Sequence, residues 1–295
     1  MIGRFINPKT DYAFKKIFGS AQSKDILISF LDGLIYEGNP TIEDLEIINP
    51  NLPPQLQGLK DTYLDVKARL NDGTLVIIEM QVLNVESFGK RVLYNAAKTY
   101  AFQLDAGEGY RMLKPIVALT ITDFEMFDEF EGVISRFVFQ EKQTNIPYAE
   151  SEMELVFVEL PKFTKDIEEL DTLTDKWIYF MKSTPSLATV PDKMDEIPAI
   201  HKAFEIANRT NLTREELEAL ERQEMFIYDQ QGAMALGQRI ARQEGLREGL
   251  QEGRQEGRQE EKQEIARQLL ALLDDDAIAR VTGLSAEEIR NLRQE

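Results

Sequence analysis

The chain has 295 residues, a formal net charge of −18, no cysteine and a single histidine, His201. The lack of cysteine excludes disulfides and thiolate metal sites, and one histidine excludes most catalytic constellations built on that residue type. The acidic balance argues against a broad nucleic-acid-binding surface, because phosphate attraction normally needs a basic face.

The N-terminal sequence MIGRFINPKTDYAF lacks the apolar run of a signal peptide, and no stretch has 18 consecutive apolar residues. We therefore expect a cytoplasmic protein with no membrane partner. Two amphipathic helices are predicted first, one that enters through 7–11 and ends at Gly19, and one over about 24–36. Asp11 and Lys15 of the first helix are candidate site-lining residues. The alternative is that Asp11 caps the helix and Lys15 faces solvent.

The stretch from Asp61 to Val82, DTYLDVKARLNDGTLVIIEMQV, predicts a β-hairpin. Its halves are joined by Asn71-Asp72-Gly73, a three-residue loop in which the glycine takes the left-handed conformation. This loop sets a register that puts Asp65 opposite Glu79. Because side chains alternate between faces, Asp65, Glu79 and Gln81 share the charged face. The apolar face is predicted to hold Leu64, Val66, Ala68, Leu70, Val76, Ile78, Met80 and Val82.

Two opposed carboxylates repel each other, and a cation between them removes that repulsion. Oxygen ligands on a short hairpin suit Mg²⁺, which takes one or two carboxylates and leaves its other positions to water and substrate phosphate. A site of this kind cleaves phosphodiesters. The alternative is an ordinary hairpin whose charges face solvent. Gln81 counts against that alternative, because the spacing of Asp65, Glu79 and Gln81 resembles the PD-(D/E)xK nuclease site, with Gln in place of the usual Lys.

A helix is predicted directly after the hairpin, over about 86–104. Arg91, Tyr94, Asn95 and Lys98 share one face of it by their spacing. Because the helix leaves the hairpin, Arg91, Tyr94 and Lys98 are candidates for contact with a substrate, although exposure to solvent explains such a face equally well.

Three strands are predicted next, over 115–121, 135–139 and 154–160. The succession of helices, hairpin, helix and strands predicts an α/β fold, a mixed sheet flanked by helices.

Five ordered blocks carry a resemblance to a known family. They are Asp11-Tyr-Ala-Phe-Lys-Lys-Ile-Phe-Gly19, Asp65-Val-Lys67, Glu79-Met-Gln81, Arg91-Val-Leu-Tyr94 and Gly107-Glu-Gly-Tyr110. Together they resemble the Rpn family, the recombination-promoting nucleases and transposases of the PD-(D/E)xK superfamily, over about residues 5–270. The resemblance implies a restriction-endonuclease-like fold and a DNA endonuclease linked to recombination or transposition, with Mg²⁺ or another divalent cation as cofactor.

By position in that pattern, Asp65 and Glu79 are the implied metal ligands, and Gln81 stands in place of the catalytic lysine. Residue 64 is leucine where the family pattern has proline. A neutral amide orients water but supplies no charge and does not act as a base, so reduced activity is compatible with Gln81. The alternative function is a catalytically weak or silent DNA-associated regulatory or assembly protein that keeps the nuclease fold.

The predicted boundaries are a nuclease core over 1–160, a helical extension over 161–241, a helical repeat arm over 242–264 and a C-terminal module over 265–295. In the arm, glycine recurs every fourth residue, which suits either a solvated spacer or close approach of another helix. The tail 237–295 is thus a candidate for homo-oligomer formation. The module resembles a helix-turn-helix in outline, and an oligomerisation or docking module is the alternative.

Overall fold

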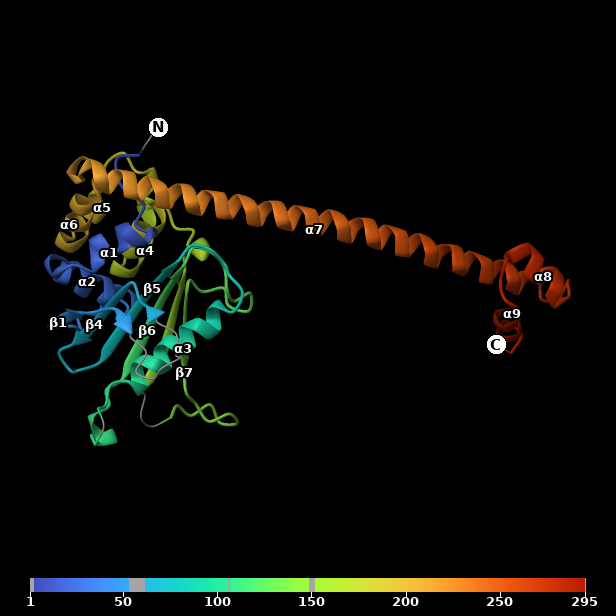
Figure 1. Cartoon of the computed structure of the whole chain (residues 1–295), viewed down its shortest axis with the longest axis horizontal. Helices are drawn as coiled ribbons and strands as arrows, with labels where there is room; N and C mark the ends of the chain where they lie inside the picture. Colours follow the sequence, from blue (N-terminus) through green and yellow to red (C-terminus); the bar gives the residue numbers. More distant parts are fainter. Residues whose placement is uncertain (1–2, 53–61, 106, 149–151, 295) are drawn as a thin grey trace. The chain divides into compact units, whose positions relative to one another are not determined.

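The computed structural model describes residues 3–52, 62–105, 107–148 and 152–294 (Figure 1). Asp61, the first residue of the predicted hairpin, lies outside them. The chain divides into two compact units, Met1–Asp229 and Gln230–Glu295.

The first unit contains most of the secondary structure. Its strands are β1 (Leu45–Ile48), β2 (Asn51–Leu52), β3 (Thr62–Tyr63), β4 (Val66–Leu70), β5 (Leu75–Gln81), β6 (Ile116–Thr122), β7 (Ile134–Val138) and β8 (Met153–Glu159). Its helices are α1 (Asp11–Phe18), α2 (Lys24–Leu34), α3 (Phe88–Ala101), α4 (Leu173–Ser183), α5 (Asp192–Asp195), α6 (Pro198–Ala207) and the beginning of α7 (Arg214–Leu269). Short 3₁₀ helices cover Ala21–Ser23, Tyr110–Met112, Leu160–Lys162, Ile167–Glu169, Thr184–Ser186 and Arg209–Asn211.

In the described part of the chain, a six-stranded sheet has the order β1-β4-β5-β6-β8-β7. Neighbours β5, β6 and β8 are parallel, whereas β1 with β4, β4 with β5, and β7 with β8 pair antiparallel. Strand β6 is buried along its whole length, as its continuous apolar sequence predicts. The predicted α/β fold with a mixed sheet and flanking helices is confirmed.

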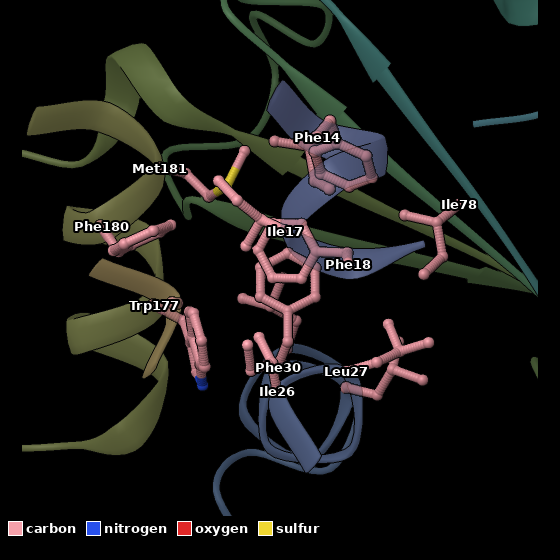
Figure 2. Packing of buried hydrophobic residues seen from close by; sticks show 14 of the residues in the cluster. Phe14, Ile17, Phe18, Ile26, Leu27, Phe30, Ile78, Trp177, Phe180 and Met181 are labelled. Carbon is pink, nitrogen blue, oxygen red and sulfur yellow. The ribbon is translucent and has the colours of Figure 1, made fainter. Parts of the chain in front are cut away.

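The large hydrophobic core lies on the face of the sheet that α1, α2, α4 and α6 cover. Figure 2 shows its aromatic centre, where Phe18, Phe30 and Trp177 meet from three different helices. The ring centroids of Phe18 and Phe30 are 4.3 Å apart, and those of Phe30 and Trp177 are 5.3 Å apart. Burial of each such ring contributes roughly 2–3 kcal/mol to folding.

The opposite face of the sheet is covered by α3 and has much smaller apolar clusters. One contains Leu64, Ile77, Ala96 and Ala118, and another contains Phe88, Val92 and Phe157. These clusters do not fill the face. Between the two clusters, polar side chains of the sheet contact polar side chains of α3, as Glu79 does with Asn95.

The hairpin forms in the predicted register, with Val66 paired to Ile78, and Gly73 has φ 92° in its loop. Its first strand differs from the prediction, because a bend after Leu64 separates β3 from β4. The bend interrupts the alternation of side chains, so Leu64 packs with Ile77 on the α3 side instead of the main core. The expectation that Leu64 lies on the main apolar face is wrong.

The second unit consists of the rest of α7, α8 (Asp275–Thr282) and α9 (Ala286–Leu292). The predicted repeat arm is helical throughout, within α7. Gly283, at φ 72°, ends α8, and Ser285 and Glu288 form the expected capping box of α9. A separate small core joins Ala266, Ile278, Leu284, Ile289 and Leu292. Among the described residues, no helix combines the length and apolar character needed to cross a bilayer.

Candidate functional site

The end of the hairpin carries the two acidic residues that the sequence singled out. The ladder between the two strands ends at the pair of Val66 and Ile78, and Asp65 and Glu79 are the next residues beyond that pair, Asp65 in the bend before β4 and Glu79 within β5. The Oδ2 atom of Asp65 accepts a hydrogen bond of 2.7 Å from the backbone N–H of Met80. This bond holds the Asp65 carboxylate against the last residues of β5.

Helix α1 contributes a second carboxylate and a cation. The Nζ atom of Lys15 lies 2.6 Å from Oδ1 of Asp11 and 3.8 Å from Oδ1 of Asp65. Asp11 does not cap the helix, because the N-cap is Thr10, whose hydroxyl accepts from the N–H of Ala13. Both sequence candidates on α1 therefore lie next to Asp65.

Burial raises the pKa of Asp65 to about 7. The Met80 N–H acts in the opposite direction, whereas the hydrogen bond and the charge of Asp11 raise the pKa further, against the charge of Lys15. The ionised form of this carboxylate is thus poorly compensated by its own chain.

Helix α3 meets the other carboxylate. The Nδ2 atom of Asn95 donates a hydrogen bond to Oε1 of Glu79, and Nε of Arg91 lies 3.8 Å from Oε2. Burial raises the pKa of Glu79, while the Asn95 hydrogen bond and the charge of Arg91 oppose that rise. Asn95 is 1% exposed, so this contact is fixed inside the interface between helix and sheet.

Gln81 is occupied at both ends of its amide. Its Nε2 atom donates to the carbonyl of Leu83 at 2.7 Å, and its Oε1 atom accepts from the Arg91 guanidinium at 2.7 Å. Gln81 therefore holds Arg91 in place beside Glu79. The guanidinium also stands over the Phe88 ring, 4.9 Å from its centroid.

The other two candidates on α3 lie elsewhere on the helix. Tyr94 is 40% exposed, and Lys98 is buried, one turn beyond Asn95, with Nζ 5.9 Å from the centroid of the Phe102 ring. Asn95 shares the helix face of Arg91 by its spacing but is not among the candidate site residues that the sequence marks. Its position four residues after Arg91 was the available signal, because that spacing aligns two side chains on one helix face.

The donor set fits a divalent cation in its chemistry. Asp65 and Glu79 supply hard oxygen ligands, and Oδ1 of Asn95 is a buried acceptor with no hydrogen-bond partner among the described residues. Within that same part of the chain, no group of three or more acidic or histidine side chains is arranged as a complete metal site. A divalent cation held by two carboxylates would take its remaining ligands from water and phosphate.

A family model described as PD-(D/E)XK nuclease family transposase matches residues 8–236, which is most of the chain. The chain belongs to this family. A second model, described as Rpn/YhgA-like nuclease family, C-terminal HTH domain, matches residues 259–294. No curated protein and no solved structure matches. The resemblance to the Rpn family is confirmed.

A cavity lies beside Asp11 at the start of α7. The Oε1 atom of Gln223 accepts from the N–H of Tyr12 at 3.1 Å and fixes α7 against α1. A cavity of about 460 Å³ opens there, lined by Asp11, Ala219, Arg222, Gln223, Phe226 and Ile227. Arg222 and Asp11 thus line the same cavity, and no sequence motif predicted a role for Arg222.

In the C-terminal HTH domain, the second helix has few free cations. Arg293 donates to Asp275 at 2.8 Å and to the carbonyls of Leu270 and Leu273 at 2.9 and 3.1 Å. It therefore holds the helices together, which leaves Arg290 as the exposed arginine of α9.

Proposed function

We propose that this member of the family is a divalent-metal-dependent DNA endonuclease that hydrolyses phosphodiester bonds in DNA recombination or transposition. The observation that carries the proposal is the arrangement of Asp65 and Glu79. Both carboxylates are mostly buried just beyond the last paired residues of the hairpin, and the cations that pair with them, Lys15 with Asp65 and Arg91 with Glu79, each lie 3.8 Å away. Buried carboxylates of that kind are expected where a cation completes the charge balance.

Asp65 and Glu79 would hold the metal, preferably Mg²⁺. A divalent cation at this site supplies positive charge for the scissile phosphate and acidity for an attacking water. The chain itself orients the two carboxylates, Asp65 through the Met80 N–H and Glu79 through Asn95. These hydrogen bonds fix the carboxylates before substrate arrives, which lowers the reorganisation needed in the transition state.

Arg91 is proposed to supply the positive charge that a lysine at position 81 would supply. Its guanidinium lies beside Glu79 and is held by Gln81, and its side chain is 46% exposed, which leaves it accessible to a substrate. A planar guanidinium matches phosphate oxygens in a bidentate manner. Gln81 is then a positioning residue that acts through Arg91.

Nicking of supercoiled plasmid in Mg²⁺ tests the carboxylates. Asp65→Asn and Glu79→Gln keep the shape of each side chain, and each is expected to lower the rate by at least about a hundredfold, because the charge that binds the cation is lost. Glu43→Gln, an exposed acid before β1, is the matched control and should nick like the wild type. Undiminished nicking by both site variants would disprove the proposal.

Calorimetric titration with Mg²⁺ separates the endonuclease from the silent DNA-associated alternative. The wild type should bind Mg²⁺ and Asp65→Asn should bind it at least tenfold more weakly. A wild type without measurable Mg²⁺ affinity would favour the silent regulatory protein.

The division of roles between Arg91 and Gln81 is testable by non-additivity. Arg91→Met should lower kcat by roughly a hundredfold, and Arg91→Lys by less, because the charge is kept. Gln81→Met should lower kcat by about tenfold in the wild type and have no further effect in Arg91→Met. Additive losses would show that Gln81 acts on the substrate directly.

The tail is proposed to assemble copies of the chain and to add DNA contact through the HTH domain. The arm supports assembly because Leu246 and Leu250 are 75% and 57% exposed, and none of its glycines has a packing neighbour among the described residues. Light scattering of a protein truncated after Ala241 tests assembly. If the number of copies per particle is the same as in the full chain, the tail does not assemble copies of the chain. Arg290→Gln should weaken DNA binding slightly, while the matched Lys142→Gln should not.

A further inference from the structure

A cationic cavity lies on the α3 face of the sheet, away from Asp65 and Glu79. Its volume is about 330 Å³. Its walls are formed by Ile48, Lys67, Arg69, Gly73, Leu75, Thr99, Phe102, Gln103, Met112 and Lys114. Three of these side chains are cationic, and no acidic side chain belongs to this lining in the part of the chain that the structure describes.

Lys67 is the inner cation of this cavity. Its side chain is half-buried and forms no hydrogen bond or ion pair among the described residues. A half-buried cation beside a second cation is unfavourable within the chain itself, so an anionic ligand would stabilise both.

Lys114 forms the outer wall. A Cβ on Gly73 would lie 3.0 Å from Cε and 3.1 Å from Cδ of Lys114, so this lysine stem crosses the hairpin loop. Its backbone is fixed by two hydrogen bonds with Gln103, from Nε2 to the Lys114 carbonyl at 2.8 Å and from the Lys114 N–H to Oε1 at 3.0 Å. Arg69 is shared with Glu46, whose Oε2 is 3.4 Å from Nη1. Lys67 and Lys114 are therefore the cations most free for a ligand.

The cavity follows the same helix and strand as the candidate site. Thr99 lines the cavity from α3, one turn beyond Asn95, and Gln103 follows just after the end of that helix. Leu75 is four residues before Glu79 on β5, or about 13 Å along the strand. This separation corresponds to roughly four steps of duplex DNA at ~3.4 Å each.

We propose that this cavity binds a backbone phosphate of the DNA strand, a few nucleotides from the phosphate that is cleaved at Asp65 and Glu79. The proposal rests on the proposed endonuclease function and adds a substrate-binding site to it. Lys67 and Lys114 contact the phosphate, and Arg69 contributes charge from the rim. Binding at this point fixes the register of the strand along α3.

A purely structural role for the same cations is the competing explanation. The carboxyl end of a helix carries partial negative charge, and the cations stand near the end of α3. In that case Lys67→Gln lowers thermal stability. A phosphate site predicts the reverse for Lys67, because removal of a half-buried cation relieves an unfavourable charge.

Fluorescence anisotropy with a short duplex in EDTA measures binding without cleavage. Lys67→Gln and Lys114→Gln should each weaken binding by roughly three- to tenfold at low salt. Each should also reduce the slope of log K against log[salt] by about 0.9, the value for one phosphate contact. Lys142→Gln, an exposed lysine in the turn after β7, is the matched control and should change neither quantity.

Three results are decisive. The proposal is overturned if Lys67→Gln and Lys114→Gln both bind the duplex with the affinity and salt slope of the control. If Lys67→Gln also has a lowered melting temperature, the cations stabilise the carboxyl end of α3 instead. A different result would overturn the DNA assignment: the wild type binds inorganic pyrophosphate by calorimetry, the variants do not, and duplex binding is unchanged. The ligand would then be a free phosphate compound. Variant-sensitive duplex binding in a protein that nicks no plasmid would support the cavity and contradict the endonuclease function instead.

Discussion

Glu79, two residues before the end of β5, and Glu159, the last residue of β8, are two acids near the same edge of the sheet, but their surroundings differ. Glu159 is fully buried and accepts from the N–H groups of Met126 and Phe127 at 2.5 and 3.1 Å, and from Nζ of Lys162 at 2.8 Å. Glu79 has one amide donor and a guanidinium at 3.8 Å. A carboxylate saturated by its own chain stabilises the fold, whereas one left partly unsaturated is suited to bind a ligand.

The saturated cluster at β8 provides the largest expected effect on stability. Lys162 also donates to the carbonyls of Phe127 and Phe130, at 2.6 Å each, so the pair fixes the whole segment after β6. Glu159→Gln should lower the free energy of unfolding by about 3 kcal/mol, because it leaves a buried ammonium without its counter-charge. Urea unfolding measures this loss.

A double-mutant cycle controls that prediction. Lys162→Met alone should cost a similar amount, and Glu159→Gln combined with Lys162→Met should cost clearly less than the sum. If Glu159→Gln lowers the free energy of unfolding by less than about 1 kcal/mol, Glu159 and Glu79 do not differ in their importance for folding, which would contradict the comparison.

Glu79→Gln should change the free energy of unfolding in the opposite direction and by a smaller amount. The amide oxygen still accepts from Asn95, and the unfavourable burial of a charge disappears, so the free energy of unfolding should rise by about 1 kcal/mol in metal-free buffer. Glu43→Gln, the exposed control, should stay within about 0.5 kcal/mol of the wild type. A marked destabilisation would mean that Glu79 is a structural acid like Glu159.

The sequence predicted what depends on local pattern. Loop chemistry at Gly73 gave the register that pairs Val66 with Ile78, and helical spacing put Asn95 beside Arg91. The apolar run at β6 and the capping box at α9 are equally local signals.

Contacts between distant side chains were not predictable in this way. The bond between Gln81 and Arg91 depends on how α3 docks on the sheet, and the Glu159 cluster depends on a segment more than 30 residues earlier. The sequence predicts the wrong face for Leu64 because the bend at Asp65, which has no glycine or proline signal, interrupts the strand pattern. Thr10 is the cap of α1, in preference to the neighbouring Asp11, because its hydroxyl reaches the Ala13 N–H.

A third acid extends the comparison to a partly exposed position, where the expected effect is smallest. Glu216 of α7 accepts from Tyr12 at 2.6 Å and pairs with Lys16 at 2.5 Å. The hydrogen bond from Lys16, followed by that from Tyr12, lowers the pKa of Glu216 from its ordinary 4.5 to about 2. Because the folded-state pKa is depressed, the stabilisation is fully present above pH 4.5 and is lost as the pH falls toward 2.

The difference in stability between the wild type and Glu216→Gln should therefore be no more than about 1 kcal/mol at pH 6, since the pair is screened by solvent. It should shrink as the pH falls and vanish only below the folded-state pKa of about 2. Thermal unfolding of both proteins at low ionic strength between pH 6 and pH 2.5 measures the trend. A difference that stays constant over this range would show that the hydrogen bond from Tyr12, independent of charge, fixes α7 to α1. A difference that shrinks would place Glu216 with Glu159, as an acid whose charge its own chain uses for folding.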